Sequence, residues 1–379
     1  MKYYIIAGEA SGDLHGSNLI SELIKLDNQA VIRCWGGDKM QAAGASIVKH
    51  YKELAFMGFI EVFLNLKTIL SNLKFCKKDM QEFNPDILIL IDYPGFNLRI
   101  AQWAKQQGLK VIYYISPQIW AWKENRVHQI KKSVDKMLCI LPFEIEFYAK
   151  WNYEVEYVGH PLIEVVNQAI KNKKALETDR REKRKNLNPI LAPIVAILPG
   201  SRKQEIKTKL PIMLMAAKQM PQVRFVLAKA PSLDDSFYEK IFQQVNFEIE
   251  TTTNTYNLLN HAQAAMVTSG TATLETALFE VPEVVCYKGN SISYQIAKKL
   301  IKIKYIALVN LIMQKEVVKE LIQHELTSEN LIKELNELLH NYDKKLQLKT
   351  DYTELKKMLS AGGNASKNAA ISIYKFLTT

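Results

Sequence analysis

The sequence predicts an α/β protein that contains two successive parallel-sheet units, and three observations carry this prediction. Apolar runs without alternation, such as Ile87–Ile91 and Val111–Ile115, recur between helical stretches in the first 160 residues. Such runs are typical of strands buried on both faces of a parallel sheet. The same rhythm returns in the second half, after a charged segment at residues 171–185. A length of 379 residues also suits two domains of ordinary size.

Each expected strand is a short apolar run that ends at a turn or at a helical stretch. In the first half these runs are Lys2–Ala7, Val31–Trp35, Asp86–Ile91, Lys110–Ile115, Lys136–Leu141 and Val155–Val158. In the second half they are Ile194–Leu198, Arg224–Ala228, Phe247–Ile249, Ala264–Thr268 and Val284–Tyr287. After Lys288 helical spacing dominates, over Leu311–Leu339 and Leu355–Leu377, with a break at Gly362–Asn364.

The domain boundaries follow from this pattern. We expect an N-terminal domain over residues 1–165, a charged linker over 166–192 and a C-terminal domain over 193–354. A C-terminal helix at residues 355–379 can pack back on the N-terminal domain. The linker is expected to be a solvated charge run, because such runs usually face water.

Composition excludes several classes of protein. Apolar residues make up 48% of the chain and charged residues 23%, which excludes disordered and collagen-like chains. The four cysteines form no CxxC, and no HExxH, DxD or close histidine pair is present, so we expect no metal and no cofactor. The N-terminus does not resemble a signal peptide, and no run of ~18 apolar residues exists, so we expect a cytoplasmic chain, soluble or peripheral.

The formal charge of +11 favours phosphates, nucleic acid or an anionic membrane surface as partners. The basic run lacks the interleaved aromatic residues that nucleic-acid binding would predict. A basic RNA-binding protein is therefore the remote alternative, and we expect no nucleic-acid partner.

Two loops in the first half follow predicted strands and carry polar side chains. The first runs from Gly8 to Ser17 and lacks the G-x-G-x-x-G spacing of a dinucleotide site. The polar residues and the glycine that mark it are Ser11, Gly12, Asp13 and His15. They can cap a helix or contact a sugar substrate. For His15 a structural role and a general-base role both stay open.

The second loop begins with Asp92 and includes Asn97. An acid at the mouth of a buried strand is partly desolvated, which raises a carboxyl pKa and suits general-base chemistry. Asn97 can cap the following helix or hold a sugar hydroxyl, and a simple turn cap remains the alternative for Asp92.

Two loops in the second half suit an anion. Gly200, Ser201 and Arg202 end a strand and precede a helix, where backbone N–H groups and a guanidinium fork can meet phosphate oxygens. The other loop opens a helix with small and hydroxyl residues, namely Ser269, Gly270, Thr271, Ala272 and Thr273. Glu275 can favour the helix dipole or hold ribose hydroxyls.

Taken in order, several segments resemble the lipid-A-disaccharide synthase family. They are GEASGDLHG, MGFIEV, IDYPGFNLRIA, ISPQIWAW, LPFE, YVGHPL, LPGSR and TSGTATLETAL, followed by VNLIMQKEVVKELIQ near the C-terminus. The resemblance implies a GT-B glycosyltransferase with two Rossmann-like domains that face each other across a cleft. It further implies a peripheral enzyme at the cytoplasmic face of the inner membrane of a Gram-negative bacterium.

The activity that the resemblance implies is a step of lipid A and lipopolysaccharide biosynthesis. UDP-2,3-diacylglucosamine would donate its sugar to 2,3-diacylglucosamine 1-phosphate (lipid X), giving a β-1,6-linked disaccharide and UDP. By matching positions, the catalytic residues would be Ser11, Asp92 and Arg202, with Glu275 on the donor, and Asn310 and Gln323 as further site residues. Many members carry a second acid in the Asp92 loop, where this chain has Gly95. A homodimer is also compatible with the sequence.

Other GT-B enzymes stay open as alternatives, namely UDP-N-acetylglucosamine 2-epimerase or a lipid-linked N-acetylglucosaminyltransferase. A diacylated rather than a plain UDP-sugar donor would discriminate between them.

Residues 56–78 are unusually apolar for a segment with charged breaks. Core packing explains most of these side chains, but acylated substrates favour a second partner. Apolar residues recur at helical spacing at Val62, Phe63, Leu66, Ile69, Leu70 and Leu73. Lysines follow at 67, 74, 77 and 78 and can meet anionic head groups. We therefore expect a peripheral, salt-sensitive membrane contact through this segment.

Overall fold

The structure, a computed structural model, describes residues 1–54, 66–122, 124–171, 192–289 and 304–378. The chain divides into two compact units. The first comprises Met1–Pro161 together with Leu359–Thr379, and the second comprises Leu162–Met358. Most of the predicted charged linker lies outside the described residues, which resume at residue 192.

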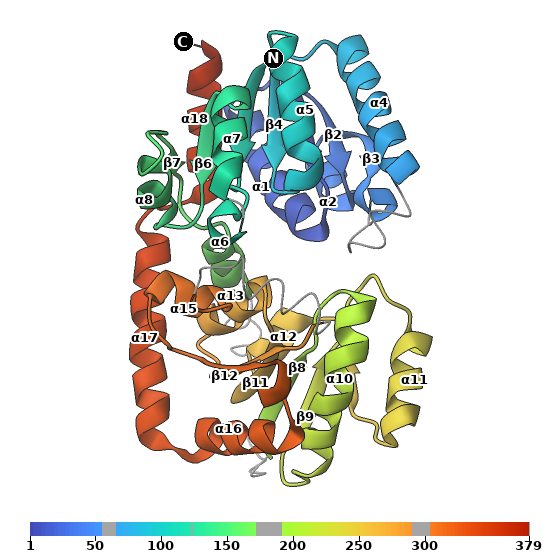
Figure 1. The fold of residues 1–379 in the computed structure, drawn as a ribbon, viewed down its shortest axis with the longest axis vertical. Coiled ribbons are helices and arrows are strands. Elements are labelled where there is room, and N and C mark those ends of the chain that lie inside the picture. The colour runs from blue at the N-terminus through green and yellow to red at the C-terminus, as the bar shows by residue number, and fades with distance from the viewer. Residues whose placement is uncertain (55–65, 123, 172–191, 290–303, 379) are drawn as a thin grey trace, which may run out of the picture. The chain divides into compact units, whose positions relative to one another are not determined.

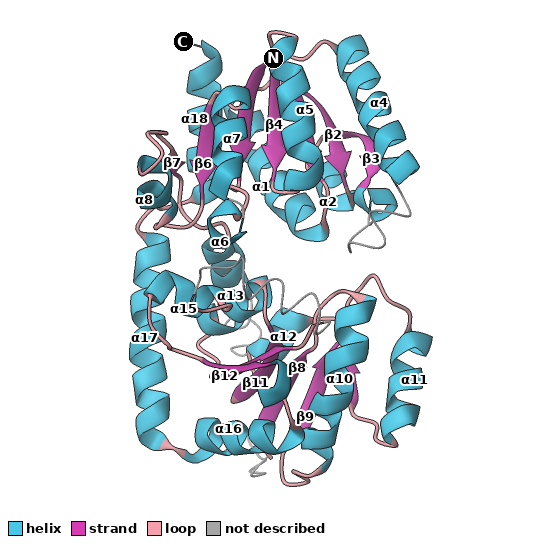
Figure 2. Ribbon diagram, viewed as in Figure 1, coloured by secondary structure: helices cyan, strands magenta, loops and turns pink. Residues whose placement is uncertain are grey.

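A seven-stranded parallel sheet forms the centre of the first unit (Figures 1 and 2). Its strands are β1 (Lys2–Ala7), β2 (Val31–Gly36), β3 (Ser46–His50), β4 (Ile87–Ile91), β5 (Lys110–Tyr114), β6 (Lys136–Cys139) and β7 (Glu156–Tyr157). Their order is β3-β2-β1-β4-β5-β6-β7. The chain therefore adds β2 and β3 on one side of β1, and then adds β4 to β7 on the other side. Between β1 and β4 lies a topological switch point, where open α/β sheets bind ligands at the carboxyl ends of their strands.

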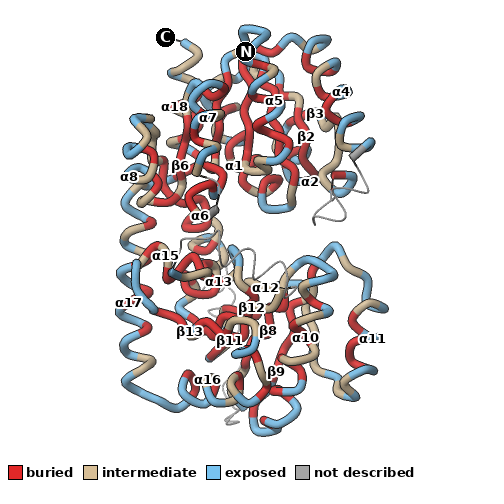
Figure 3. Tube along the Cα trace, viewed as in Figure 1, coloured by how far each residue is buried: buried red, intermediate tan, exposed pale blue. Residues whose placement is uncertain are grey.

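Helices cover both faces of this sheet, and Figure 3 shows the strands as buried. On one face lie α4 (Leu66–Phe83), α5 (Pro94–Gln106), α7 (Val127–Ser133) and α8 (Glu144–Ala149). On the other face lie α1 (Ala10–Leu26), α2 (Asp38–Ala42) and the C-terminal helix α18 (Ala365–Thr378). α18 contributes Ala369, Ala370 and Ile373 to the core beside α1. The short α6 (Ile119–Trp122) follows β5. Burial on both faces explains why β4 and β5 are apolar without alternation.

The second unit repeats the design with a six-stranded parallel sheet. Its strands are β8 (Ile194–Leu198), β9 (Arg224–Ala228), β10 (Glu250–Thr252), β11 (Ala264–Thr268), β12 (Glu283–Tyr287) and β13 (Lys319–Ile322). Their order is β10-β9-β8-β11-β12-β13, so the switch point lies between β8 and β11.

The helices of the second unit again lie on both sides of the sheet. They are α10 (Lys203–Lys218), α11 (Asp235–Val245), α12 (Thr255–Leu259), α13 (Thr271–Leu278), α15 (Leu308–Met313), α16 (Ser328–His340) and α17 (Tyr342–Ser360). α12 and α13 contact one core cluster of the sheet, while α10 packs against α16. The predicted helix break is confirmed, because α17 ends at Ser360 and α18 begins at Ala365.

Three strand predictions need correction. Phe247–Ile249 is not a strand, since β10 begins three residues later at Glu250. No sequence pattern predicts β3. The helix predicted throughout Leu311–Leu339 is wrong, because β13 intervenes between α15 and α16. Both missed strands are edge strands; β3 pairs with the preceding strand β2, and β13 pairs with β12.

The predicted amphipathic helix is described only from Leu66 onward, so Val62, Phe63 and Leu64 lie outside the described residues. Leu73 is buried and Ile69 packs partly against the core of the first unit. Leu70, in contrast, is 56% exposed, and Phe75 is 45% exposed. The apolar residues at helical spacing therefore divide, with Ile69 and Leu73 packed on the core and Leu70 exposed. In the described part of the chain, no helix is long and apolar enough to cross a membrane.

Candidate functional site

The loops that follow β1 and β4 meet at the switch point of the first sheet. A Cβ atom added to Gly8 would lie 2.4 Å from Cγ of Tyr93, so the Tyr93 ring packs directly on the Gly8 backbone. The β1 and β4 strands pair in parallel, with Ala7 opposite Ile91. Two segments that are more than eighty residues apart in the sequence are thereby brought side by side at the carboxyl edge.

Asp92 occupies a strained position at this edge. Its φ is 44° and that of Tyr93 is 50°, both in the left-handed region that costs a residue with a side chain roughly 1–2 kcal/mol. Two buried groups hold the turn. Asn97 donates from Nδ2 to the carbonyls of Ile91 (3.2 Å) and Asp92 (2.7 Å), and the Tyr113 hydroxyl donates to the Asp92 carbonyl (2.5 Å). Strain maintained in this way is typical of functional sites.

Asn97 consequently has a structural role in the described geometry. It is fully buried, and its amide nitrogen is committed to the backbone of the Asp92 turn. The helix cap considered from the sequence is wrong, because Tyr93 is the N-cap of α5 and Asn97 lies within the helix. Asn97 fixes where the Asp92 carboxylate can project.

Asp13 is a helix cap rather than an exposed substrate contact. It is 3% exposed, and its carboxylate accepts hydrogen bonds from the backbone N–H groups of Gly37 (2.8 Å), Met40 (3.0 Å) and Lys39 (3.2 Å) at the start of α2. Gly12 serves close packing, because a Cβ there would approach the Ala7 Cβ to 3.0 Å. Both residues build the site without facing its ligand.

His15 is buried on α1, and burial lowers its pKa to about 4. His160 is buried as well, and burial together with the charge of His15 lowers its pKa to about 3. Both imidazoles are therefore neutral at pH 7. The structural role considered for His15 fits this environment better than the general-base role.

Ser11 and Glu9 are the polar residues of the first loop that retain exposure. Ser11 is exposed in the first turn of α1, and Glu9 is half-buried at its N-cap. Burial and the charge of Glu9 raise the pKa of Tyr93. Glu9 thus brings a carboxylate beside the Asp92 loop, although no sequence motif marks it as a site residue.

Gly95 stands in the Asp92 loop where many family members carry a second acid. A Cβ at Gly95 would meet no atom within 4 Å, so the loop has space for a side chain there.

The loops after β8 and β11 flank the switch point of the second sheet. Gly200 has a φ of 108°, and a Cβ there would lie 2.7 Å from the Glu205 carboxylate and 3.4 Å from the Thr268 side chain. Arg202 is the N-cap of α10, and its guanidinium is 53% exposed and 3.4 Å from Oε1 of Glu205. Ser201 is exposed beside it.

The second loop opens α13 with the features of an anion site. Gly270 is the N-cap with a φ of 150°, and a Cβ there would meet no atom within 4 Å. Thr271 is exposed and Ala272 half-buried in the first turn of α13, while the Thr273 N–H donates to the Gly270 carbonyl (3.2 Å). Ser269 donates to the Ile306 carbonyl (3.2 Å), and Thr273 is buried and donates to the Gly270 carbonyl (2.8 Å). The hydroxyls of Ser269 and Thr273 are therefore bound to backbone carbonyls and stabilise the turn.

Glu275 is half-buried on α13 and accepts a hydrogen bond from the Tyr256 hydroxyl (3.3 Å). Burial raises its carboxyl pKa, and this hydrogen bond opposes the shift. The contact holds the carboxylate in place on the helix that the glycine-containing turn opens.

Asn310 is an interior residue. It is fully buried and makes four hydrogen bonds, to the Val318 carbonyl, the Glu320 carboxylate and the N–H groups of Val317 and Val318. Such a saturated amide has no capacity left for a substrate. Gln323 follows β13 with a φ of 55°, and its side chain accepts from the Gly289 N–H (3.0 Å). It ties two strand ends together.

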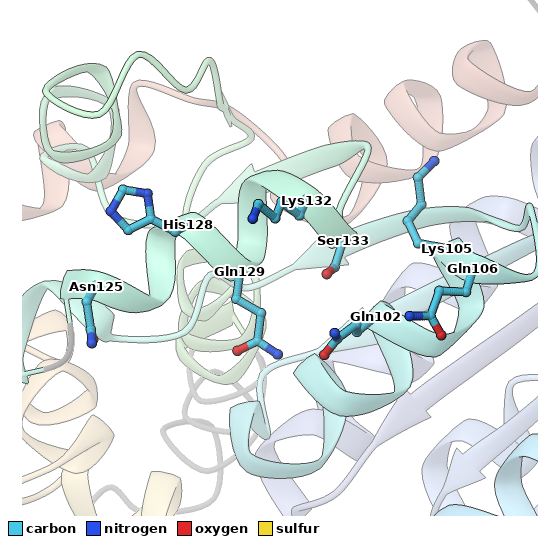
Figure 4. A pocket seen from close by; sticks show the side chains of 8 residues that line it. All are labelled: Gln102, Lys105, Gln106, Asn125, His128, Gln129, Lys132 and Ser133. Atoms are coloured by element: carbon cyan, nitrogen blue, oxygen red, sulfur yellow. The ribbon is translucent and has the colours of Figure 1, made fainter.

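A separate groove of about 700 Å³ lies along α5 and residues 125–133 (Figure 4). Amide, lysine and histidine side chains line it, and none of the predicted site residues is among them. We do not assign the reaction to this groove.

The arrangement of the sheets defines the class of protein. The structure of this chain is similar to that of UDP-GlcNAc 2-epimerase from Neisseria meningitidis. The TM-score is 0.65 at 13% identity, and 100% of both chains is covered. It is also similar to the calicheamicin glycosyltransferase CalG4, with a TM-score of 0.61 at 14% identity, covering 100% of this chain and 98% of that one. The fold is GT-B, which glycosyltransferases and these epimerases share.

Sequence comparison identifies the family within this class. A family model described as lipid-A-disaccharide synthetase matches residues 3–374. The lipid-A-disaccharide synthase of Geobacter metallireducens is 36% identical over 97% of this chain and 95% of its own length, and one from Coxiella burnetii is 37% identical over 98% of each. The chain belongs to the lipid-A-disaccharide synthase family and is a glycosyltransferase of lipid A biosynthesis. The resemblance drawn from the motifs is confirmed.

Proposed function

We propose that this chain transfers its sugar in a single inverting displacement, with the chemical work divided between the two switch points. The substrates are those that the family implies, a UDP-2,3-diacylglucosamine donor and lipid X as acceptor. The observation that carries the proposal is that a strained acidic loop flanks one switch point, while two anion-suited loops flank the other.

In this mechanism Asp92 accepts the proton of the acceptor's 6-hydroxyl as that oxygen attacks the anomeric carbon of the donor. The bond from that carbon to UDP breaks, and inversion gives the β-1,6 linkage. The turn held by Asn97 and Tyr113 supports this role, because a general base is effective only when its carboxylate is fixed within reach of the proton. Ser11 contacts the acceptor, and Glu9 adds a second carboxylate.

UDP leaves with negative charge on its diphosphate. Arg202 and the N–H groups at the start of α13 stabilise that charge as it develops, since preorganised donors at such a position cost no reorganisation in the transition state. Glu275 holds the ribose. The exposure of Arg202 and the open Gly270 turn support this assignment.

The direct test is UDP release from purified protein given the diacylated donor. We expect release that depends on lipid X, and little or none from UDP-N-acetylglucosamine. Release without an acceptor, or conversion of UDP-N-acetylglucosamine to its epimer, would instead favour the epimerase alternative that shares the fold.

Metal dependence gives a second prediction. Activity should survive EDTA, because Arg202 and backbone N–H groups meet the diphosphate charge that a divalent cation meets in other enzymes. Turnover is measured before and after chelation, with the protein dialysed in between. Loss of activity on chelation and its return with Mg²⁺ would contradict the proposed donor site.

We also propose a peripheral membrane contact through residues 56–78. The exposed Leu70 and Phe75, with the exposed Lys67, Lys74 and Lys78 on the same helix, support it. Apolar side chains beside lysines suit the boundary between head groups and acyl chains. Acylated substrates also reside there, so the contact would bring the enzyme to its substrates.

Replacing Leu70 and Phe75 together by serine should release the protein from anionic vesicles at low salt. Leu346→Ser is the matched control, because Leu346 is 54% exposed on α17, away from this helix in the sequence. Vesicle co-sedimentation measures the effect, and turnover of detergent-dispersed substrate should be retained at least in part. If the wild-type protein never co-sediments at low salt, the membrane proposal is wrong.

A further inference from the structure

Lys209 is a buried lysine on a helix that otherwise turns apolar side chains inward. It is 2% exposed and lies on the inner face of α10 with Ile206, Leu210 and Met213. Side chains on a helix lean toward its N-terminus, so the Lys209 side chain extends back toward the Gly200–Arg202 loop. No sequence motif marks this residue as a functional one.

The charged and polar groups that act on Lys209 belong to residues at the carboxyl edge of the second sheet. Burial lowers the pKa of Lys209, the nearby Glu205 carboxylate and Cys286 thiol oppose this shift, and Arg202 adds to it. Cys286 lies near the end of β12, opposite Thr268 of β11. The residues around Lys209 thus come from α10 and from the strand next to the switch point.

The ammonium has no hydrogen bond or ion pair within the described part of the chain. Burying a charged group without such partners is costly, so a buried lysine of this kind requires an anion nearby. A second unsatisfied group lies at the same edge, because the buried Thr268 hydroxyl also has no hydrogen-bond partner. The Thr268 side chain in turn lies against Gly200.

We propose that Lys209 is a further anion-recognition residue, whose ammonium forms the buried floor of the diphosphate site. The proposal rests on the proposed function of the Gly200–Arg202 loop and extends it. Without nucleotide, the Glu205 carboxylate pairs with Arg202 (3.4 Å) and is near Lys209 without forming an ion pair with it. When a diphosphate binds, two cations and one carboxylate leave a net positive charge for its oxygens. Lys209 contributes its charge from the buried side of the site, where water screens it least.

Binding of UDP and of uridine to the full-length protein tests this role by calorimetry. Lys209→Met keeps a flexible side chain of similar length without the charge. We expect the Kd for UDP to rise by about tenfold or more, because a charge in a site of low dielectric is weakly screened. The Kd for uridine should not change, since uridine carries no phosphate. Lys207→Met, an exposed lysine two residues earlier on the same helix, is the matched control and should leave both constants unchanged.

The outcomes separate an electrostatic role from a structural one. Unchanged UDP binding in Lys209→Met overturns the proposal, and so does an equal loss of UDP and uridine binding, which would indicate damage to the fold. Should the methionine variant fail to fold, Lys209→Gln is measured by the same comparison. Transfer by the wild-type protein is assayed separately, so failure of the proposed reaction is distinguishable from failure of the Lys209 assignment.

Discussion

Asp92→Asn should lower kcat by about 10²–10⁴-fold, the range over which a positioned general base contributes. The amide has the size of the carboxylate but cannot accept the proton of the acceptor hydroxyl. Asparagine also tolerates the left-handed backbone of residue 92, so the turn should persist. Steady-state transfer with saturating donor and lipid X measures the effect, and the thermal unfolding midpoint should not fall.

Asp86→Asn is the matched control for this variant. Asp86 lies at the amino end of the same strand, exposed, where it accepts a hydrogen bond from the Lys2 backbone (2.7 Å). An asparagine can accept that bond equally well, so transfer should stay normal. A folded Asp92→Asn enzyme with near-wild-type kcat would exclude Asp92 as the base and direct attention to Glu9.

Arg202→Ala should cost about 2.7–4 kcal/mol of transition-state stabilisation, as expected for the loss of one preorganised donor to a developing anion. The exposed guanidinium contributes little to the core, so the variant should fold. Arg202→Lys should restore little activity, because a single ammonium cannot reproduce the planar fork of donors. The ratio kcat/KM for the UDP-sugar is the quantity to measure.

Arg224→Ala provides the control for charge removal. Arg224 begins β9, so it lies at the amino ends of the strands, whereas Arg202 follows the carboxyl end of β8. Arg224 pairs with Glu250 at the surface (2.6 Å). Exposed pairs of this kind contribute about 0–1 kcal/mol, so activity should change little. If Arg202→Ala and Arg224→Ala behaved alike, the diphosphate would have to be recognised elsewhere.

Local sequence patterns predict most of the fold because the central strands are apolar on both faces. β1, β8, β9 and β11 begin and end at the predicted residues. β13 has the sequence KELI inside a helical spacing, and only its pairing with β12 makes it a strand. Such pairing is absent from any local window. β3 has the sequence SIVKH and is only partly buried, so it lacks the continuous apolar run by which the central strands are predicted.

The loops of the candidate site can be proposed from the sequence, but which of their polar residues are buried in the scaffold and which stay exposed cannot. Asp13, Asn97 and Asn310 look like functional polar residues in the sequence, yet each turns inward and holds backbone in place. Lys209 is the reverse case in our proposal, because its helical spacing resembles that of a core position although it carries a charge. Which way a polar side chain faces depends on the strand order, and that order emerges only when distant segments pair.

The division of labour between the two sheets is tested most directly by UDP binding to Asp92→Asn and Arg202→Ala, measured by calorimetry beside the transfer assay. The account predicts that Asp92→Asn binds UDP as the wild type does and fails in transfer, whereas Arg202→Ala binds UDP much more weakly. Loss of UDP binding in Asp92→Asn, or its retention in Arg202→Ala, would contradict it.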